Sequence, residues 1–312
     1  MSVTAPPAAA SRLHPLARWW ATLRPRTLTV SLSPVLLGVA LAWAVTGSWR
    51  PLPALACLLG ALLIQIGTNL HNDAGDFLRG ADTSARLGPP RACAQGWLTA
   101  RQVRNAAWGA FALAFLVGIY LVAVGGWPIV ALGLASLVAG WAYTDGPRPI
   151  AYSPTGEVFV WLFFGLAAVG GTVYLQLDHI PAAAWLAAHL LGTLAAAVIT
   201  VNNLRDEAED RRSGKRTLVV AGGRRLGLAV LGALMLTPFA LLPLMMPLTG
   251  QPSLWLLLPW LQFPQALRLL GEIRRTPPGP VYNRLLGATA RLQLGFAVTL
   301  AAGLLLARLI AH

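Results

Sequence analysis

Long runs with few or no charged residues alternate with short polar segments along most of this chain. A helix needs about 20 apolar residues to cross the hydrocarbon core of a membrane. The runs have this length or about twice this length, and they lack the strict alternation of a barrel strand. The pattern predicts spanning helices within residues 27–49, 51–72, 105–144, 158–204, 226–267 and 286–310.

Three of these runs are long enough for two helices each, and turn-forming residues lie near the middle of each one. The residues that mark these breaks are Gly125 to Pro128, then Asp178 with Pro181, then Pro243, Pro247 and Pro252. We therefore expect an all-α integral membrane protein with nine transmembrane helices, forming one membrane-embedded domain over residues 23–312. Residues 1–22 are rich in alanine, proline and serine, and we expect them to be a short disordered leader.

The composition supports this class and also orients the chain. Hydrophobic residues make up 56% of the 312 residues and charged residues only 11%, whereas soluble domains carry about 25% charged residues. The net charge of +13 does not indicate a nucleic-acid partner, because the basic residues form short clusters between the apolar runs. Of the 24 basic residues, 22 fall on one side of the predicted topology, and only Arg50 and Arg308 do not. Positive charge is enriched on cytoplasmic loops, so we predict that this side and the N-terminus are cytoplasmic.

Seven of the 11 acidic residues gather in two segments on the same side, 69–82 and 202–211. Each segment follows an apolar run and contains an asparagine four residues before an aspartate: Asn69 with Asp73, and Asn202 with Asp206. Residues four apart share one helix face. Asp76 extends the first face and Asp210 extends the second, so the two segments form a weak internal repeat about 133 residues apart.

Paired carboxylates at the mouth of a helical bundle suit Mg²⁺, which binds through one or two carboxylates together with substrate phosphates. Basic residues interleaved with these acids, such as Arg79, Arg91 and Lys215, would hold an anionic substrate. The alternative is a solvated loop with weak surface ion pairs, but two matching clusters on one side of the bundle argue against it. A transporter would place its ionisable residues nearer the middle of the membrane.

Several segments together resemble the UbiA superfamily of intramembrane prenyltransferases, and within it the branch that prenylates 1,4-dihydroxy-2-naphthoate. In the first acidic segment, Gly80 and Ala81 come directly before the third acid, Asp82. This order resembles the motif of the naphthoate branch. Asp145 departs from the family pattern and would need a partner such as Arg148, and residues 226–285 match only in hydropathy. The matching segments are 23–42, 69–92, 143–152, 157–176 and, most specifically, 201–223.

The resemblance implies a UbiA-type bundle with cytoplasmic Asp-rich loops in a bacterial inner membrane. It implies Mg²⁺-dependent transfer of a polyprenyl group from polyprenyl diphosphate to 1,4-dihydroxy-2-naphthoate with loss of CO₂, giving demethylmenaquinol for menaquinone biosynthesis. The alternative acceptors are 4-hydroxybenzoate and homogentisate, and the prenyl chain length and oligomeric state stay open. Residues 73–104 and 205–225 are expected to form lid loops.

The resemblance also assigns roles to individual residues. The catalytic acids would be Asp73, Asp76, Asp206 and Asp210. The metal ligands would be these four together with Asn69 and Asn72, with Asp82 as a further candidate. The diphosphate would be bound by Arg79, Arg91, Arg148, Arg205 and Lys215. The aromatic acceptor would lie against Tyr143 and Asn202.

Overall fold

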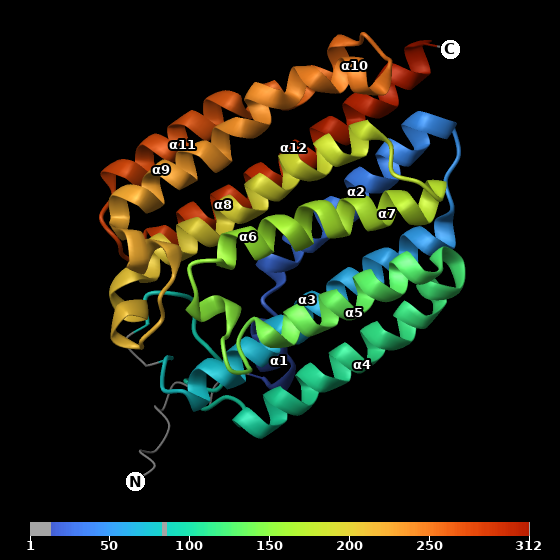
Figure 1. The fold of residues 1–312 in the computed structure, drawn as a ribbon. Coiled ribbons are helices and arrows are strands. Elements are labelled where there is room, and N and C mark those ends of the chain that lie inside the picture. The colour runs from blue at the N-terminus through green and yellow to red at the C-terminus, as the bar shows by residue number, and fades with distance from the viewer. Residues whose placement is uncertain (1–13, 83–85, 312) are drawn as a thin grey trace, which may run out of the picture.

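The computed structural model describes residues 14–82 and 86–311, and every regular element in these ranges is helical. This confirms the expected all-α class. Most of the helices lie side by side along one direction (Figure 1). Their bounds are α1 Pro15–Leu23, α2 Pro25–Thr46, α3 Pro51–Leu78, α4 Ala100–Gly125, α5 Trp127–Ala142, η2 Ile150–Tyr152, α6 Gly156–Trp161, η3 Leu162–Ala167, α7 Ala168–Leu177, α8 Ala182–Arg212, α9 Leu218–Leu241, η4 Leu242–Leu244, α10 Met245–Thr249, η5 Leu254–Gln262, α11 Phe263–Arg275 and α12 Tyr282–Ala311.

Seven helices of the described chain are long and apolar enough to cross a membrane. They belong to the runs that the hydropathy pattern singled out. A count of nine would also need α5, an apolar helix of 16 residues, and the stretch from Leu254 to Arg275, where the 3₁₀-helix η5 leads directly into α11. The count of nine and the side of the membrane on which each loop lies stay predictions.

The two acidic segments are more helical than expected. Helix α3 continues to Leu78 and α8 to Arg212, so the loops predicted at 73–104 and 205–225 shorten to 79–99 and 213–217. Glycines with positive φ follow both helices, Gly80 at 69° and Gly214 at 78°, and such residues end helices without steric cost. Both acidic helix ends lie at the same end of the bundle (Figure 1).

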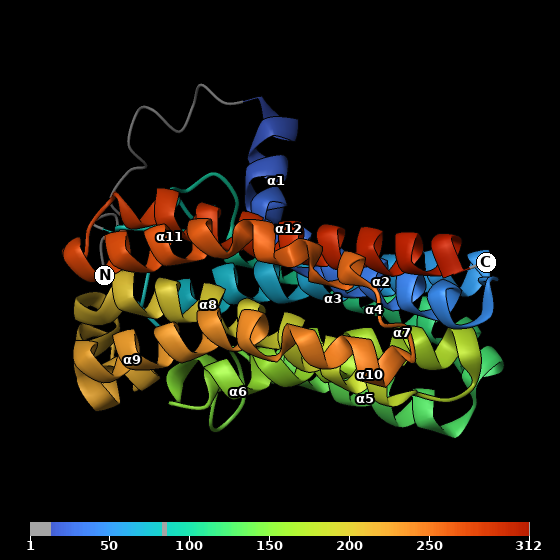
Figure 2. The same ribbon diagram turned by 90° about the horizontal axis from the view of Figure 1, so that it is seen from above.

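The segment before the first span is partly ordered. Residues 15–22 of the expected disordered leader belong to α1, which has a proline in its first turn, where the missing N–H costs nothing. Helix α1 stands out from the other helices (Figure 2), and Trp19 and Leu23 pack against the core beside α3. Residues 1–13 lie outside the described residues.

Helix α8 packs in the interior of the bundle, and small residues allow its neighbours to approach closely. Ala184, Ala187 and Ala188 are fully buried. A Cβ atom on Gly165 of the π-helical turn η3 would lie 2.8 Å from the Cα atom of Gly192 in α8, so only glycine fits there. Close contacts between small residues are a common way to pack helices in membranes. This packing holds the acidic end of α8 inside the protein.

Candidate active site

A cavity of about 1000 Å³ runs between the helices. Near the ends of α3 and α8 its wall carries the acids Asp76, Asp206 and Asp210. Elsewhere the wall is mostly apolar, with residues such as Phe115 and Ile119 of α4. The cavity therefore joins a strongly charged mouth to an apolar chamber, which suits a ligand with an anionic head and a hydrocarbon body.

Asp76 is the centre of the α3 side of the mouth. Its side chain is 1% exposed, and it accepts hydrogen bonds from Asn72 Nδ2, Tyr152 Oη and Lys215 Nζ, each at 3.0 Å. Burial and the neighbouring Asp76 carboxylate raise the pKa of the Tyr152 hydroxyl. Tyr152 therefore stays protonated and serves as a donor. Segments far apart in the sequence thus converge on this one carboxylate.

Asp206 is the centre of the α8 side. Arg205 Nε donates to Asp206 Oδ1 at 2.7 Å and Arg205 Nη2 to Asp206 Oδ2 at 2.6 Å, a two-point contact that favours arginine over lysine. Asn202 Nδ2 donates to Asp206 Oδ2 at 3.3 Å. One turn further along α8, the Asp210 carboxylate interacts electrostatically with Lys215 and with Asp76. The two acidic helix ends therefore face one another across the mouth.

The structure shifts the register of the internal repeat. In both helices an asparagine donates its side-chain amide to the aspartate four residues later, but the pairs are Asn72 with Asp76 and Asn202 with Asp206. The repeat proposed from the sequence used Asn69 with Asp73 instead. Because both α3 pairs, Asn69 with Asp73 and Asn72 with Asp76, have the same spacing of four residues, periodicity alone could not select the pair that faces the mouth.

Asp73 and Asn69, both expected to bind metal, have other partners. The buried Asp73 carboxylate accepts backbone N–H groups from Ala92 at 2.9 Å and Cys93 at 3.1 Å, and it is absent from the cavity wall. It therefore anchors the loop 79–99 to α3. Asn69 does line the cavity, but its amide donates to Thr27 Oγ1 at 3.0 Å.

Asp82 forms ion pairs with two arginines of the same loop. Its carboxylate pairs with Arg86 and lies 3.4 Å from Arg91 Nε. Burial raises the pKa of Asp82 to about 6. Arg86 and Arg91 line the cavity, whereas Asp82 does not. Asp82 thus lies behind the mouth and positions the two guanidinium groups.

The remaining expected residues divide into two groups. Arg91, Arg205, Lys215, Tyr143 and Asn202 all line the cavity. Arg79 and Arg148 do not.

Asp145 pairs with Arg79, at 3.0 Å, rather than with Arg148. Its other carboxylate oxygen lies 3.4 Å from His71 Nε2. Arg148 is exposed. Asp145 therefore interacts with groups behind α3 and adds no uncompensated charge to the mouth.

Three residues of the mouth were not predicted. Arg24 adopts a positive φ of 54° between α1 and α2, a conformation that is uncommon for a side-chain-bearing residue, and its Nη2 donates to Asn72 Oδ1 at 3.2 Å. Tyr152 reaches Asp76, as described above. Asn283 of α12 accepts from Arg205 and donates to the Leu87 carbonyl, both at 2.8 Å. A sequence signal exists for Arg24 and Tyr152, which lie in the matching segments 23–42 and 143–152, but none exists for Asn283.

The donor set fits a divalent cation held jointly with a phosphate ligand. Within residues 14–82 and 86–311, no three His, Cys, Asp or Glu side chains are close enough to share one metal ion. Mg²⁺, however, takes one or two carboxylates and completes its shell with water and phosphate oxygens. Asp76 and Asp206, each bonded to an asparagine and facing one mouth, provide such a partial set on each side.

The chain is similar to known proteins in both sequence and fold. The chain is 37% identical to the 1,4-dihydroxy-2-naphthoate octaprenyltransferase of Haemophilus influenzae, over 68% of this chain and 71% of the relative. It is 32% identical to the enzyme of that name from Bacillus subtilis, over 92% of each chain. A UbiA homologue from Archaeoglobus fulgidus, solved with GPP and Mg²⁺, superimposes with a TM-score of 0.66 at 17% identity, over 91% of this chain and 99% of that one.

The model of one family covers most of the chain, from residue 31 to residue 286. This range includes both acidic helix ends and the loop between α3 and α4. It extends beyond residue 226, where the sequence resemblance rested on hydropathy alone. The chain is a multi-pass membrane protein and belongs to the UbiA prenyltransferase family.

Proposed function

We propose that this protein transfers a polyprenyl group from polyprenyl diphosphate to 1,4-dihydroxy-2-naphthoate, with loss of CO₂, in menaquinone biosynthesis. The observation that carries the proposal is the likeness to 1,4-dihydroxy-2-naphthoate octaprenyltransferases over up to 92% of the chain. The cavity supports it, because a charged mouth continuous with an apolar chamber suits a diphosphate joined to an isoprenoid.

The basic residues of the mouth bind the diphosphate. Arg91, Lys215 and Arg205 line the cavity from the loop after α3, the loop after α8 and α8 itself. Guanidinium groups bind phosphate oxygens with two parallel hydrogen bonds. As the allylic C1–O bond breaks, its electron pair goes to the diphosphate, and these cations stabilise the developing charge.

Mg²⁺ would be held by Asp76 and Asp206, with Asp210 and the amides of Asn72 and Asn202 beside them. When bound, it neutralises the diphosphate leaving group. Asp73 and Asp82 do not contact the metal or the diphosphate in this proposal. They position the loop 79–99, which carries Arg86 and Arg91 at the mouth.

The apolar chamber protects the allylic cation from water, which would convert it to an alcohol. The ring of the acceptor attacks the cation through the carbon that bears the carboxylate, and a new C–C bond forms. The carboxylate then leaves as CO₂, and the electron pair of the broken C–C bond restores the aromatic ring, so both hydroxyl groups keep their protons in the product. Tyr143 and Asn202 line the cavity, and the acceptor would lie against them.

The test uses the purified full-length protein in lipid nanodiscs, with octaprenyl diphosphate and carboxyl-labelled 1,4-dihydroxy-2-naphthoate. We expect one labelled CO₂ per prenylated product, identified by mass, and no turnover after Mg²⁺ is removed with EDTA. A faster reaction with 4-hydroxybenzoate that retains the carboxylate would contradict the acceptor assignment. Full turnover without divalent metal would contradict the metal site.

We also propose that the acidic end of the bundle faces the cytoplasm of a bacterium. The cations near the opposite end include Arg50, which pairs with Asp178 at 2.6 Å, and Arg308, which donates to the Ala44 carbonyl. Positive charge is enriched on cytoplasmic loops. A periplasmic reporter fused after the last residue should be active, and one inserted between α8 and α9 should be inactive; the reverse result would invert the topology.

A further inference from the structure

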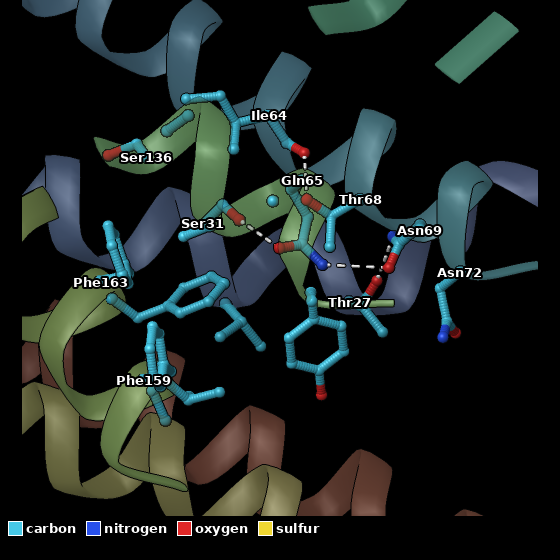
Figure 3. Close-up of a pocket in the computed structure, with 18 of the residues that line it drawn as sticks. Thr27, Ser31, Ile64, Gln65, Thr68, Asn69, Asn72, Ser136, Phe159 and Phe163 are labelled. Atoms are coloured by element: carbon cyan, nitrogen blue, oxygen red, sulfur yellow. Dashed lines mark hydrogen bonds between the residues drawn. The ribbon is translucent and has the colours of Figure 1, made fainter. Parts of the chain in front are cut away.

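A ladder of hydrogen-bonded, uncharged polar side chains lines the cavity beside Asn72 (Figure 3). Ser31 Oγ donates to Gln65 Oε1 at 3.4 Å, and Gln65 Nε2 donates to Asn69 Oδ1 at 3.2 Å. Asn69 in turn donates to Thr27 Oγ1 at 3.0 Å. All four residues line the cavity. The ladder joins α2 to α3 with hydrogen bonds between neutral groups only.

The ladder continues the helix face that carries the first acidic cluster. Gln65, Asn69, Asn72 and Asp76 follow one another at intervals of three or four residues, so they lie on one side of α3. At 1.5 Å per residue, Gln65 lies about 16 Å along the helix from Asp76. A diphosphate at the mouth therefore leaves Gln65 free for a second ligand deeper in the cavity.

Binding of an isoprenoid chain does not explain why these polar side chains line the cavity, because the chain has no hydrogen-bonding group. Amides and hydroxyls buried against hydrocarbon destabilise a protein unless their hydrogen bonds are made. Beyond its bonds to Ser31 and Asn69, the Gln65 carboxamide has one more N–H and one more lone pair. These suit a hydroxyl group on the ligand, which both donates and accepts.

Aromatic side chains lie across the cavity from Gln65 (Figure 3). The rings of Phe159 and Phe163 are stacked, with centroids 6.1 Å apart and an interplanar angle of 14°. Phe163 belongs to the π-helical turn η3, and such turns are frequent at functional sites. A flat ring between these phenylalanines and the ladder would contact apolar surface on one side and hydrogen-bonding groups on the other.

We propose that Gln65, supported by Ser31, hydrogen-bonds the 4-hydroxyl of 1,4-dihydroxy-2-naphthoate, while Phe159 and Phe163 contact its rings. The inference rests on the proposed function and extends it to the recognition of the acceptor. Gln65 is then the residue that distinguishes a dihydroxynaphthoate from a naphthoate with one hydroxyl. Its role is to position the acceptor, since it lies away from the carbon that reacts.

The test compares two acceptors in two proteins. The ratio of kcat/KM for 1,4-dihydroxy-2-naphthoate to that for 1-hydroxy-2-naphthoate is measured with octaprenyl diphosphate and Mg²⁺ in the wild type and in Gln65→Met, which has a similar size and no amide. Because the difference in intrinsic reactivity of the acceptors is common to both proteins, it cancels. We expect the ratio to fall about tenfold in Gln65→Met, as for a lost hydrogen bond to substrate.

Ser136→Ala is the matched control. Ser136 also lines the cavity, but its hydroxyl donates to the Leu132 carbonyl of its own helix, so the ratio should stay at the wild-type value. Ser31→Ala removes the support of Gln65 and should lower the ratio by a smaller factor; it also serves if Gln65→Met does not fold.

Equal losses for both acceptors would show a structural role and overturn the inference, while leaving the proposed function intact. If the wild type does not convert 1,4-dihydroxy-2-naphthoate at all, the proposed function fails and this inference fails with it.

Discussion

The acidic ends of α3 and α8 have similar sequences but are held in place in different ways. On α3, Asp76 accepts hydrogen bonds from Tyr152 and Lys215, which lie 76 and 139 residues away. On α8, Asp206 is bound by Arg205 and Asn202 of its own helix. The first cluster is therefore assembled by distant segments, whereas the second is largely organised by one helix.

This difference implies that the two clusters have different roles in binding the ligand. The α3 cluster can form only when the loops that carry Tyr152, Lys215 and Arg91 are in place. In the α8 cluster, the hydrogen bonds that Asp206 accepts all come from its own helix, and Arg205 is almost completely buried. We therefore expect the α8 side to be preorganised for diphosphate and the α3 side to couple ligand binding to the order of the loops.

The largest effects should come from Asp76→Asn and Asp206→Asn. Asparagine still accepts hydrogen bonds but carries no charge to hold a cation. We expect each variant to lower kcat about 10³-fold, comparable to the loss of one electrostatic stabiliser in an active site. The thermal midpoint should fall for both variants, because each carboxylate is the partner of a largely buried cation, Lys215 for Asp76 and Arg205 for Asp206, and an unpaired buried charge destabilises a protein. The variants should differ in protease sensitivity: the segment 213–217, which carries Lys215, should be cut faster only in Asp76→Asn.

Turnover, thermal unfolding and limited proteolysis of both purified proteins check this prediction. Turnover within tenfold of wild type for either variant would remove that acid from the site. Equal protease sensitivity of the segment 213–217 in the two variants would remove the proposed difference between the two clusters.

A smaller effect is expected for Asp73→Asn. The carboxylate of Asp73 accepts two backbone N–H groups, and the amide side chain would replace one acceptor with a donor. Losing such a buried bond costs about 1–3 kcal/mol. Protease should cut the loop 79–99 faster, and KM for the prenyl diphosphate should rise, while the Mg²⁺ concentration needed for half-maximal activity stays the same.

Metal titrations and limited proteolysis separate this anchoring role from metal binding. If Asp73→Asn raised the Mg²⁺ requirement as strongly as Asp76→Asn does, Asp73 would be a metal ligand, as its place in the sequence motif suggested.

The sequence predicted the positions of the spanning helices more accurately than the residues at which those helices end. Apolar runs of about 20 residues are a local signal, and they located the spans. The continuation of α3 and α8 beyond those runs is set by where Gly80 and Gly214 stop each helix, which hydropathy does not report. The π-helical turn at 162–167 depends on packing against α8 and has no counterpart in the apolar pattern.

Only part of the site could be predicted, because sequence spacing is also a local signal. Spacing identified the acids, but it could not choose between Asp73 and Asp76, which differ by less than one turn of the helix. Asn283 is brought to Arg205 only by tertiary packing, 78 residues away in the sequence. Contacts of this kind leave no local pattern, so they could be found only in the structure.

A further prediction concerns this contact between α12 and the mouth. Asn283→Leu removes the bonds to Arg205 and to the Leu87 carbonyl. We expect kcat/KM to fall about tenfold, as for the loss of a charge-assisted hydrogen bond. Because Asp206 keeps its bonds to Arg205 and Asn202, the metal requirement should not change. A changed requirement would mean that the α8 cluster is less self-contained than its geometry indicates.

The smallest effect is expected for Arg148→Gln, and it tests how far the cationic surface of the mouth extends. Arg148 lies in the loop after α5, is exposed and does not line the cavity, although its sequence position suggested diphosphate binding. Arg91→Gln is the matched control, since Arg91 lines the cavity and lies 3.4 Å from Asp82. Exposed charges are screened by solvent and salt, so Arg148→Gln should change KM for the prenyl diphosphate less than about twofold, whereas Arg91→Gln should raise it about tenfold. An equal rise in both variants would show that the loop after α5 closes over the ligand, and the mouth would then be assembled from more distant segments than the α3 cluster already requires.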